Sequence, residues 1–350
     1  MKVVICWPQI SGYMAACWRA LAKCEGVSLF VLAFSAERDA AFSQATMAGL
    51  SCELLDPIKR HDSAYVHERV AAQSPDVIVI PGWLHAPYSA LAMDRAMASV
   101  KFVMGFDTPF SGSWRQRLAR AKIGRLIDRM DLVVVAGERA FGLARYLKVP
   151  ERKILRGVYG YDDELLAFVQ QERAADWPRS FLYVGRYVED KAIDVLLDGY
   201  ARYRKGASGP WGLTCCGTGP MATAVAGAPG VTDLGFVQPS ELPGILLHHG
   251  VFVLASRFEP WGVALAEAMA SGLPAICTEA CGASIDLVRH LHNGLLIPTN
   301  DVQALASAMG WMQAHADRLP EMGRRAREFA VAFSAERWAE RWGERLKGLG

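Results

Sequence analysis

Short runs of apolar, mostly β-branched residues recur along the chain, and segments long enough for a helix separate them. Because each run is continuously apolar rather than alternating, both faces of the strand it forms must be covered, as in parallel sheets between layers of helices. The runs fall into two sets, which predicts an α/β fold with two Rossmann-like domains. The expected strands are residues 3–6, 29–34, 77–80, 102–104, 132–135, 181–184, 213–215, 251–254, 275–277 and 295–297.

A chain of 350 residues suits two domains. Between the two sets, residues 170–179 are mostly polar and contain the helix-stopping Pro178, which indicates a linker. Near the end of the chain, Trp338 and Trp342 recur at helical spacing among Arg and Glu residues, which predicts an amphipathic helix that packs on another element. We expect a first domain at 1–170, a linker at 171–179, a second domain at 180–332 and a terminal helix at 333–350.

Composition excludes several classes of protein. Apolar residues make up 52% and charged residues 21% of the chain, and no stretch approaches the roughly 18 uncharged apolar residues of a membrane span. The apolar run at residues 1–8 is too short for a signal peptide, so we expect a cytoplasmic location. A formal charge of +2 without an aromatic-basic motif gives no reason to expect nucleic acid. Eight scattered cysteines without zinc spacing predict reduced core thiols and no metal site.

The stretch 256–274 carries the clearest chemistry. A strand ends, a loop with Glu259 follows, and a helix starts near Gly262, whose free backbone N–H groups and positive dipole end suit a diphosphate. Glu267 lies about a turn and a half into this helix and can accept from vicinal ribose hydroxyls, while Glu259 can meet hydroxyls of a sugar. The spacing alone leaves an alternative open. The helix could be an ordinary core helix, with Glu267 on its surface and Glu259 in a salt bridge in the loop.

Two cations follow the first strand of the second set. Arg186 comes directly after the strand and Lys191 lies five residues further on. A guanidinium offers bidentate hydrogen bonds and an ammonium offers a point charge, so both can stabilise a diphosphate that gains negative charge as it leaves. Gly217 and Gly219 lack the third glycine and the later acidic residue of a dinucleotide fingerprint, which argues against a nicotinamide enzyme.

Taken together, residues 181–298 resemble the retaining family 4 glycosyltransferases of the GT-B fold. The matching features, in the family's order, are the 181–186 strand with its Gly-Arg and following lysine, the glycine turn 216–220, the following strand 234–237, and the two glutamates followed by Ala-Met-Ala-x-Gly-x-Pro. The resemblance implies two Rossmann-like domains facing each other across a deep cleft, with the C-terminal helix crossing back to the N-terminal domain. It also implies pyrophosphate binding by Arg186 and Lys191 without metal, and the absence of any Asp-x-Asp agrees.

The same resemblance implies a set of donor-binding residues, namely Gly12, Gly185, Gly217, Gly219, Phe236, Val237, Gly262, Val263, Ala264 and Glu267. Phe236 and Val237 are expected near the base, and a UDP-sugar is favoured over a GDP-sugar, with no other cofactor. Ala192 stands where the family usually has glycine, and we expect ordinary backbone angles there.

The N-terminal half matches the family more weakly. Gly12 is the single glycine of the loop after the first strand. Many relatives have a histidine after the strand at 102–104, and this chain has Asp107, which can accept from a sugar hydroxyl or stabilise positive character at the anomeric carbon. Capping of the next turn is the alternative for Asp107, and His85 is a second candidate for the histidine's place.

A basic amphipathic segment spans Trp114 to Arg129, with six cations against Asp128 and an apolar stripe. Such a helix can rest on anionic lipid beside the acceptor site, which would make the acceptor lipid-linked or acidic. A core helix with a solvated basic face is the plainer interpretation.

These features predict transfer of a sugar from a nucleotide-diphosphate sugar to an acceptor hydroxyl, and the family resemblance implies that the configuration is retained. The predicted catalytic residues are Arg186, Lys191, Glu259 and Asp107, which act by positioning and electrostatics rather than as a covalent nucleophile. The alternatives are another GT-B enzyme, either a phosphorylase or a nucleotide-sugar epimerase, and a non-catalytic nucleotide-sugar-binding protein.

Overall fold

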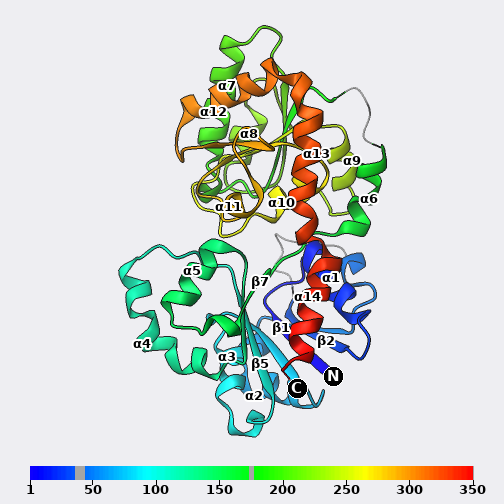
Figure 1. The fold of residues 1–350 in the computed structure, drawn as a ribbon, viewed down its shortest axis with the longest axis vertical. Coiled ribbons are helices and arrows are strands. Elements are labelled where there is room, and N and C mark those ends of the chain that lie inside the picture. The colour runs from blue at the N-terminus through cyan, green and yellow to red at the C-terminus, as the bar shows by residue number, and fades with distance from the viewer. Residues whose placement is uncertain (36–43, 173–176, 350) are drawn as a thin grey trace. The chain divides into compact units, whose positions relative to one another are not determined.

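The computed structural model describes residues 1–35, 44–172 and 177–349 (Figure 1). This part of the chain forms two compact units. Unit 1 comprises the residues up to Tyr161 together with those from Phe333 onward, and unit 2 runs from Asp162 to Ala332. Helix α6 (Asp163–Glu172), which we expected to close the first domain, belongs to unit 2 and contacts α9 and α10 there. Unit 2 therefore begins before the expected linker, of which residues 173–176 lie outside the described residues.

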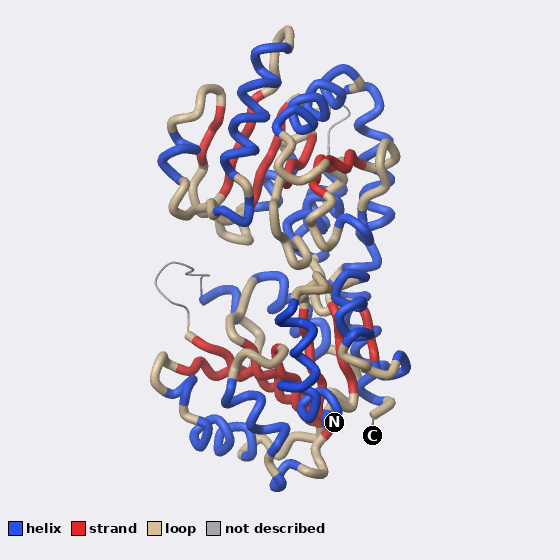
Figure 2. The backbone as a smooth tube through the Cα atoms, turned by 90° about the vertical axis from the view of Figure 1, so that its left-hand side faces the viewer, coloured by secondary structure: helices blue, strands red, loops and turns tan. Residues whose placement is uncertain are grey.

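Unit 1 is built on a parallel sheet with the strand order β3-β2-β1-β4-β5-β6-β7 within the described residues. Helices lie on either side of this strand layer (Figure 2). The strands are β1 (Lys2–Trp7), β2 (Ser28–Phe34), β3 (Cys52–Leu55), β4 (Val77–Pro81), β5 (Lys101–Phe106), β6 (Leu132–Val135) and β7 (Ile154–Arg156). The helices are α1 (Gly12–Ala22), α2 (Ser63–Ala71), α3 (Ala86–Met93), α4 (Trp114–Arg129), α5 (Glu138–Tyr146) and α14 (Ala335–Lys347).

The tryptophan stripe near the end of the chain explains why α14 packs in unit 1. Trp338 and Trp342 are buried and stack with ring centroids 4.6 Å apart. Their indole Nε1 atoms donate to the carbonyls of Val158 and Gly157, each at 2.9 Å, so the buried N–H groups are satisfied. Helix α14 also lies along α1. A helix at the far end of the sequence thus completes the N-terminal fold.

Unit 2 contains a second parallel sheet, whose order in the described residues is β10-β9-β8-β11-β12-β13. Its strands are β8 (Ser180–Val184), β9 (Gly212–Cys216), β10 (Val231–Asp233), β11 (Val251–Leu254), β12 (Ala275–Thr278) and β13 (Gly294–Ile297). Its helices besides α6 are α7 (Ile193–Gly206), α8 (Ala222–Ala226), α9 (Leu242–Leu247), α10 (Val263–Ala270), α11 (Ser284–Leu287), α12 (Val302–Ala314) and α13 (Leu319–Ala330). The predicted class, two Rossmann-like α/β domains, is confirmed.

All ten expected strands are present, and the structure adds three that the apolar pattern missed, β3, β7 and β10. Each of these lies at an edge of its sheet and is partly exposed. An edge strand is covered on fewer sides, so it carries polar residues such as Glu53, Arg156 and Thr232 and lacks a continuous apolar run. The strand that the resemblance implied at residues 234–237 is wrong, because β10 (Val231–Asp233) precedes this segment, which is an irregular loop.

The structure bears on the cysteines and on membrane-spanning segments. All eight cysteines are free, and six of them are buried. Within the described residues, no helix combines the length and the apolar character needed to span a membrane.

Candidate functional site

The sheet of unit 2 has a switch point between β8 and β11. Strand β8 pairs with β9 on one side and with β11 on the other, so the connections that leave β8 and β11 run in opposite directions. In open parallel sheets, ligands bind outside the carboxyl ends of the strands at such a point. Arg186 follows β8, and the loop with Glu259 follows β11. The topology thus brings together the two motifs that the sequence placed 70 residues apart.

Glycines allow the loops at this edge to pack closely. The Tyr183 hydroxyl donates to the carbonyl of Arg186 at 3.0 Å, and a Cβ on Gly185 would lie only 2.8 Å from that hydroxyl. A Cβ on Gly217 would lie 1.9 Å from the carbonyl oxygen of Gly185. Any side chain at either position would force these loops apart. Gly185 and Gly217 therefore fix the backbone that presents Arg186.

The turn beyond Gly217 continues the same edge of the sheet. The Gly217 amide donates to the carbonyl of Gly235 at 2.7 Å, which ties the β9 turn to the segment holding Phe236 and Val237. Phe236 is 43% exposed, so its ring is open to a ligand. Gly219 has φ +151° and a Cβ there would lie 2.5 Å from the carbonyl oxygen of Tyr187. Three of the expected donor-binding glycines, Gly185, Gly217 and Gly219, thus lie in connected turns at this edge of the sheet.

Lys191 and Glu259 form an ion pair across this edge. Their side chains are 11% and 14% exposed, so both charges are largely removed from water. Lys191 ends a short 3-10 helix (Glu189–Lys191) between β8 and α7, and Glu259 lies in the loop between β11 and α10. The sequence predicted a role for each residue but not their contact. One cation and one carboxylate therefore share a site in which either can meet a ligand.

Arg257 holds these two segments together, a role that the sequence did not indicate. Its guanidinium donates to both carboxylate oxygens of Asp194 at the start of α7, at 2.8 and 2.5 Å, and to Asn300 at 2.6 Å. The backbone amides of Arg257 and Phe258 also donate to the carbonyl of Asp190. The Glu259 loop is thus fixed to the segment that carries Lys191. Arg257 gave no sequence signal because its partner lies 63 residues away.

Gly262 has φ +106° and forms the N-cap of α10, whose first residues are Val263 and Ala264. This left-handed conformation strongly favours glycine, and a Cβ there would lie 2.8 Å from the Sγ of Cys281. Burial raises the pKa of Cys281 to about 12, so this thiol stays protonated at neutral pH and is no nucleophile.

Glu267 lies further along α10 and is only partly exposed. Removal of water from its carboxylate raises its pKa to about 8, and the negative charge of Asp162 adds to the effect. The carboxyl is therefore partly protonated at neutral pH. Its charge state can respond to a ligand that donates hydrogen bonds.

The expectation of ordinary angles at Ala192 is wrong. Ala192 has φ +51° and ψ +47°, the left-handed conformation that the family's usual glycine adopts without strain. It is fully buried at the start of α7. The sequence could not reveal this because an alanine normally indicates helix or strand angles. The strain is confined to the backbone next to Lys191.

Unit 1 has a smaller group of polar side chains at the carboxyl end of its sheet. The Tyr159 hydroxyl donates to the Oδ2 of Asp107 at 2.9 Å, and the Tyr159 ring packs edge-on against Tyr13, 5.7 Å away. Tyr13 follows Gly12 at the start of α1. Burial raises the pKa of Asp107, and the Tyr159 hydrogen bond partly offsets that rise. Asp107 thus lies in a group of aromatic side chains near Gly12.

His85 follows the neighbouring strand β4 and precedes α3. Its ring packs against Phe34, with centroids 5.1 Å apart. Burial lowers its pKa, and the nearby charges of Arg60 and His61 lower it further, which favours the neutral imidazole. His85 and Asp107 therefore follow adjacent strands, since β4 pairs with β5.

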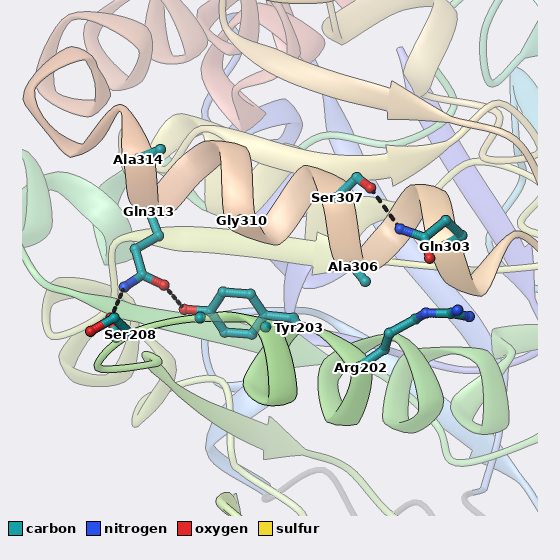
Figure 3. Close-up of a pocket in the computed structure, with 11 residues that line it drawn as sticks. Arg202, Tyr203, Ser208, Gln303, Ala306, Ser307, Gly310, Gln313 and Ala314 are labelled. Carbon is teal, nitrogen blue, oxygen red and sulfur yellow. Dashed lines mark hydrogen bonds between the residues drawn. The ribbon is translucent and has the colours of Figure 1, made fainter.

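A separate groove in unit 2 lies between α7 and α12 (Figure 3). Four of the polar side chains that line it bond to one another or to the backbone: Tyr203 to Gln313, Gln313 to the carbonyl of Ser208, and Gln303 to Ser307. None of the predicted site residues lines this groove. Among the described residues, no group of three or more His, Cys, Asp or Glu side chains is placed to hold a metal ion.

Part of the chain matches a known protein family. The family model described as glycosyl transferases group 1 matches residues 178–315, which include every predicted site residue of unit 2. Residues 178–315 are a glycosyl transferases group 1 domain. The rest of the chain lies outside this match.

Beyond the group 1 domain, the chain is similar to curated proteins. It is 28% identical to D-rhamnosyltransferase WbpZ of Pseudomonas aeruginosa over 252 residues, which are 66% of this chain and 65% of that protein. It is 45% identical to probable sucrose-phosphate synthase 3 of Arabidopsis thaliana over 60 residues, which are 17% of this chain and 6% of that protein. The chain thus spans less than two thirds of the length of these relatives.

Solved structures match both units. Sucrose-phosphate synthase of Thermosynechococcus elongatus aligns with a TM-score of 0.75 and 19% identity, covering 100% of this chain and 99% of that one. HepE of Anabaena in complex with UDP and glucose aligns with a TM-score of 0.77 and 17% identity, covering 99% of this chain and 100% of that one. The fold is GT-B.

Proposed function

We propose that this protein is a group 1 glycosyltransferase that moves a sugar from a nucleotide-diphosphate sugar to an acceptor hydroxyl. The observation that carries the proposal is the ion pair of Lys191 with Glu259 at the switch point where Arg186 also follows β8. A lone cation would suit many anions. Two cations beside a carboxylate match a ligand that has both a diphosphate and a hydroxyl-rich sugar.

Each residue of this group has a distinct task in the proposed reaction. The bond from the anomeric carbon to the phosphate oxygen breaks, and Arg186 and Lys191 stabilise the negative charge that collects on the diphosphate. Glu259 accepts hydrogen bonds from sugar hydroxyls and holds the ring in place. The acceptor oxygen forms the new bond, and its proton passes to the leaving phosphate. No protein nucleophile takes part, and configuration is retained, as the family resemblance implies.

The proposed donor is a UDP-sugar, bound without metal. HepE, which shares the fold, has been solved with UDP and with UDP-glucose. In this chain the N-terminus of α10 at Gly262 would receive the diphosphate, Glu267 would accept from the ribose hydroxyls, and Phe236 with Val237 would lie near the base.

The acceptor belongs to unit 1 in this proposal. Asp107, which accepts a hydrogen bond from Tyr159, would accept another from a sugar hydroxyl, and Gly12 at the start of α1 is a further proposed donor-binding residue. The acceptor is a saccharide or a lipid-linked saccharide. The protein would work in the cytoplasm.

A thermal-shift screen of UDP, GDP, ADP and dTDP, with their common sugar conjugates, tests the proposal. We expect UDP and one UDP-sugar to raise the unfolding temperature equally with and without EDTA, because two cations and a helix N-terminus bind the diphosphate. Stabilisation by none of these nucleotides would contradict the proposal. Binding followed by phosphate-dependent turnover, or by a changed sugar without an acceptor, would instead indicate a phosphorylase or an epimerase.

The raised pKa of Glu267 predicts a pH-dependent affinity for the donor. Ribose hydroxyls donate to the ionised carboxylate, so binding requires the deprotonated form, which is lost as pH falls below about 8. We expect the association constant for UDP-glucose to fall about twentyfold between pH 8.5 and 6.5. Isothermal titration calorimetry measures this directly. UDP-glucose is the suitable probe because its diphosphate, esterified at both ends, does not titrate in this range.

Glu267→Gln provides the matched control for this dependence. The amide cannot ionise, so the variant should bind more weakly at pH 8.5 but with an almost flat profile. A wild-type affinity that stays constant from pH 8.5 to 6.5 would rule out the role of Glu267 as an ionised acceptor.

A further inference from the structure

Helix α4 (Trp114–Arg129) of unit 1 has an exposed face that no other described element covers, and it lies at the edge of the unit beside α5 (Figure 1). The opposite side packs into the core through Leu126 and Ile127. Exposed residues recur at helical spacing along one arc, so they form a continuous strip. We call this strip the α4 face; its residues are Trp114, Arg115, Arg117, Leu118, Ala121, Lys122 and Arg125.

The cations of the α4 face have no carboxylate partner among the described residues. Arg115, Arg117, Lys122 and Arg125 form no ion pair there, and Asp128, the acidic residue of the helix, accepts from Arg120 at 2.7 Å. By contrast, basic residues on two other helices have acidic partners. On α13, Arg324 and Arg325 pair with Glu321, and on α14, Arg337 pairs with Glu340. The α4 face thus carries four cations without an acidic partner among the described residues, and the exposed carboxylate of the same arc, Asp128, is paired with Arg120.

Large apolar side chains lie among these cations. Trp114 is 67% exposed and Leu118 is 53% exposed. Phe110, in the loop before α4, packs against Tyr146 of α5 with ring centroids 5.0 Å apart, and both rings are exposed. Exposed aromatic rings beside unpaired cations are costly in water but suit the boundary between lipid headgroups and acyl chains.

We propose that the α4 face, together with Phe110 and Tyr146, docks on a lipid bilayer that contains anionic headgroups. The apolar side chains would enter the headgroup boundary, and the four cations would face the negative surface. A bilayer suits a strip of this kind better than a single small ligand, because its charges are spread along a helix and do not converge on one point. Residues 108–113 alone separate Trp114 from Asp107, so docking would bring the Asp107 loop to the membrane. This last step rests on the proposed function and implies a lipid-borne acceptor.

Flotation of the full chain with vesicles tests the docking. Vesicles of phosphatidylcholine alone are compared with vesicles in which part of the lipid is phosphatidylglycerol. We expect binding to the anionic vesicles and little binding to the neutral ones. Lys122→Ala/Arg125→Ala should weaken the partition roughly thirtyfold, since each cation near an anionic surface contributes about fivefold. Trp114→Ala/Leu118→Ala should also weaken it, because apolar burial is lost.

Arg324→Ala/Arg325→Ala is the matched control, since it removes the same two charges from a neutralised surface of unit 2. It should bind vesicles like the wild type. An equal loss in this control, or equal binding to neutral vesicles, would overturn the proposal. The proposal would also be overturned if the protein bound a soluble acidic polysaccharide through the same α4 residues and did not bind vesicles. Each variant should keep wild-type UDP affinity, so a failure of docking is distinguishable from a failure of the proposed transferase function.

Discussion

Replacement of Arg186 by alanine is expected to lower the turnover number by at least about a hundredfold, the usual cost of losing a donor that acts in the transition state. The side chain is exposed and donates no hydrogen bond within the described residues, so nothing in the fold depends on it. The unfolding temperature should therefore stay close to that of the wild type. The loss should appear mainly in the turnover number, because the charge on the diphosphate grows as the glycosidic bond breaks.

Arg179→Ala is the matched control for this variant. Arg179 is also an exposed arginine, but it precedes β8 at the amino end of the strand, whereas Arg186 follows the carboxyl end. The control should keep full activity. Steady-state kinetics with a UDP-sugar and a measured acceptor compare the two variants. Near-native turnover in Arg186→Ala would remove this residue from the proposed mechanism.

The central strands of both sheets could be predicted from the sequence because both of their faces are buried. A run such as residues 251–254 must be continuously apolar when helices cover it on two sides, and this requirement is visible without any structure. The edge strands β3, β7 and β10 could not be predicted in this way. Their partial exposure allows polar residues, so they lack a continuous apolar run. A continuous apolar run therefore indicates that a segment is buried, and it reveals a strand only where that strand is buried.

The candidate site was predictable in its local motifs but not in its long-range contacts. Glu259, Gly262 and Glu267 lie close in sequence, so a strand, a loop and a helix start are enough to relate them. The bond from Tyr159 to Asp107 joins residues 52 positions apart, and no spacing rule connects them. The left-handed angles of Ala192 are imposed by the turn around it, against the preference of alanine itself.

Lys191→Ala is expected to have two effects at once, because Lys191 serves both the fold and the proposed reaction. Turnover should fall at least about a hundredfold, since a positive charge beside the diphosphate is lost. The chain should also lose about 2 kcal/mol of unfolding free energy, because the Glu259 carboxyl group would be left at 14% exposure without its partner. Urea unfolding measures the stability effect, and steady-state kinetics measure the turnover.

A double variant separates the two effects. In Lys191→Met/Glu259→Gln, neither charge remains in the site, so most of the lost stability should return while turnover stays low. Lys205→Ala, which removes an exposed lysine from the end of α7, should change neither quantity and serves as the control. If the double variant regained both stability and turnover, Lys191 would be a structural partner of Glu259 alone, and the site would need another source of charge for the leaving group. If it regained stability alone, the pair would be needed for turnover as well as for the fold.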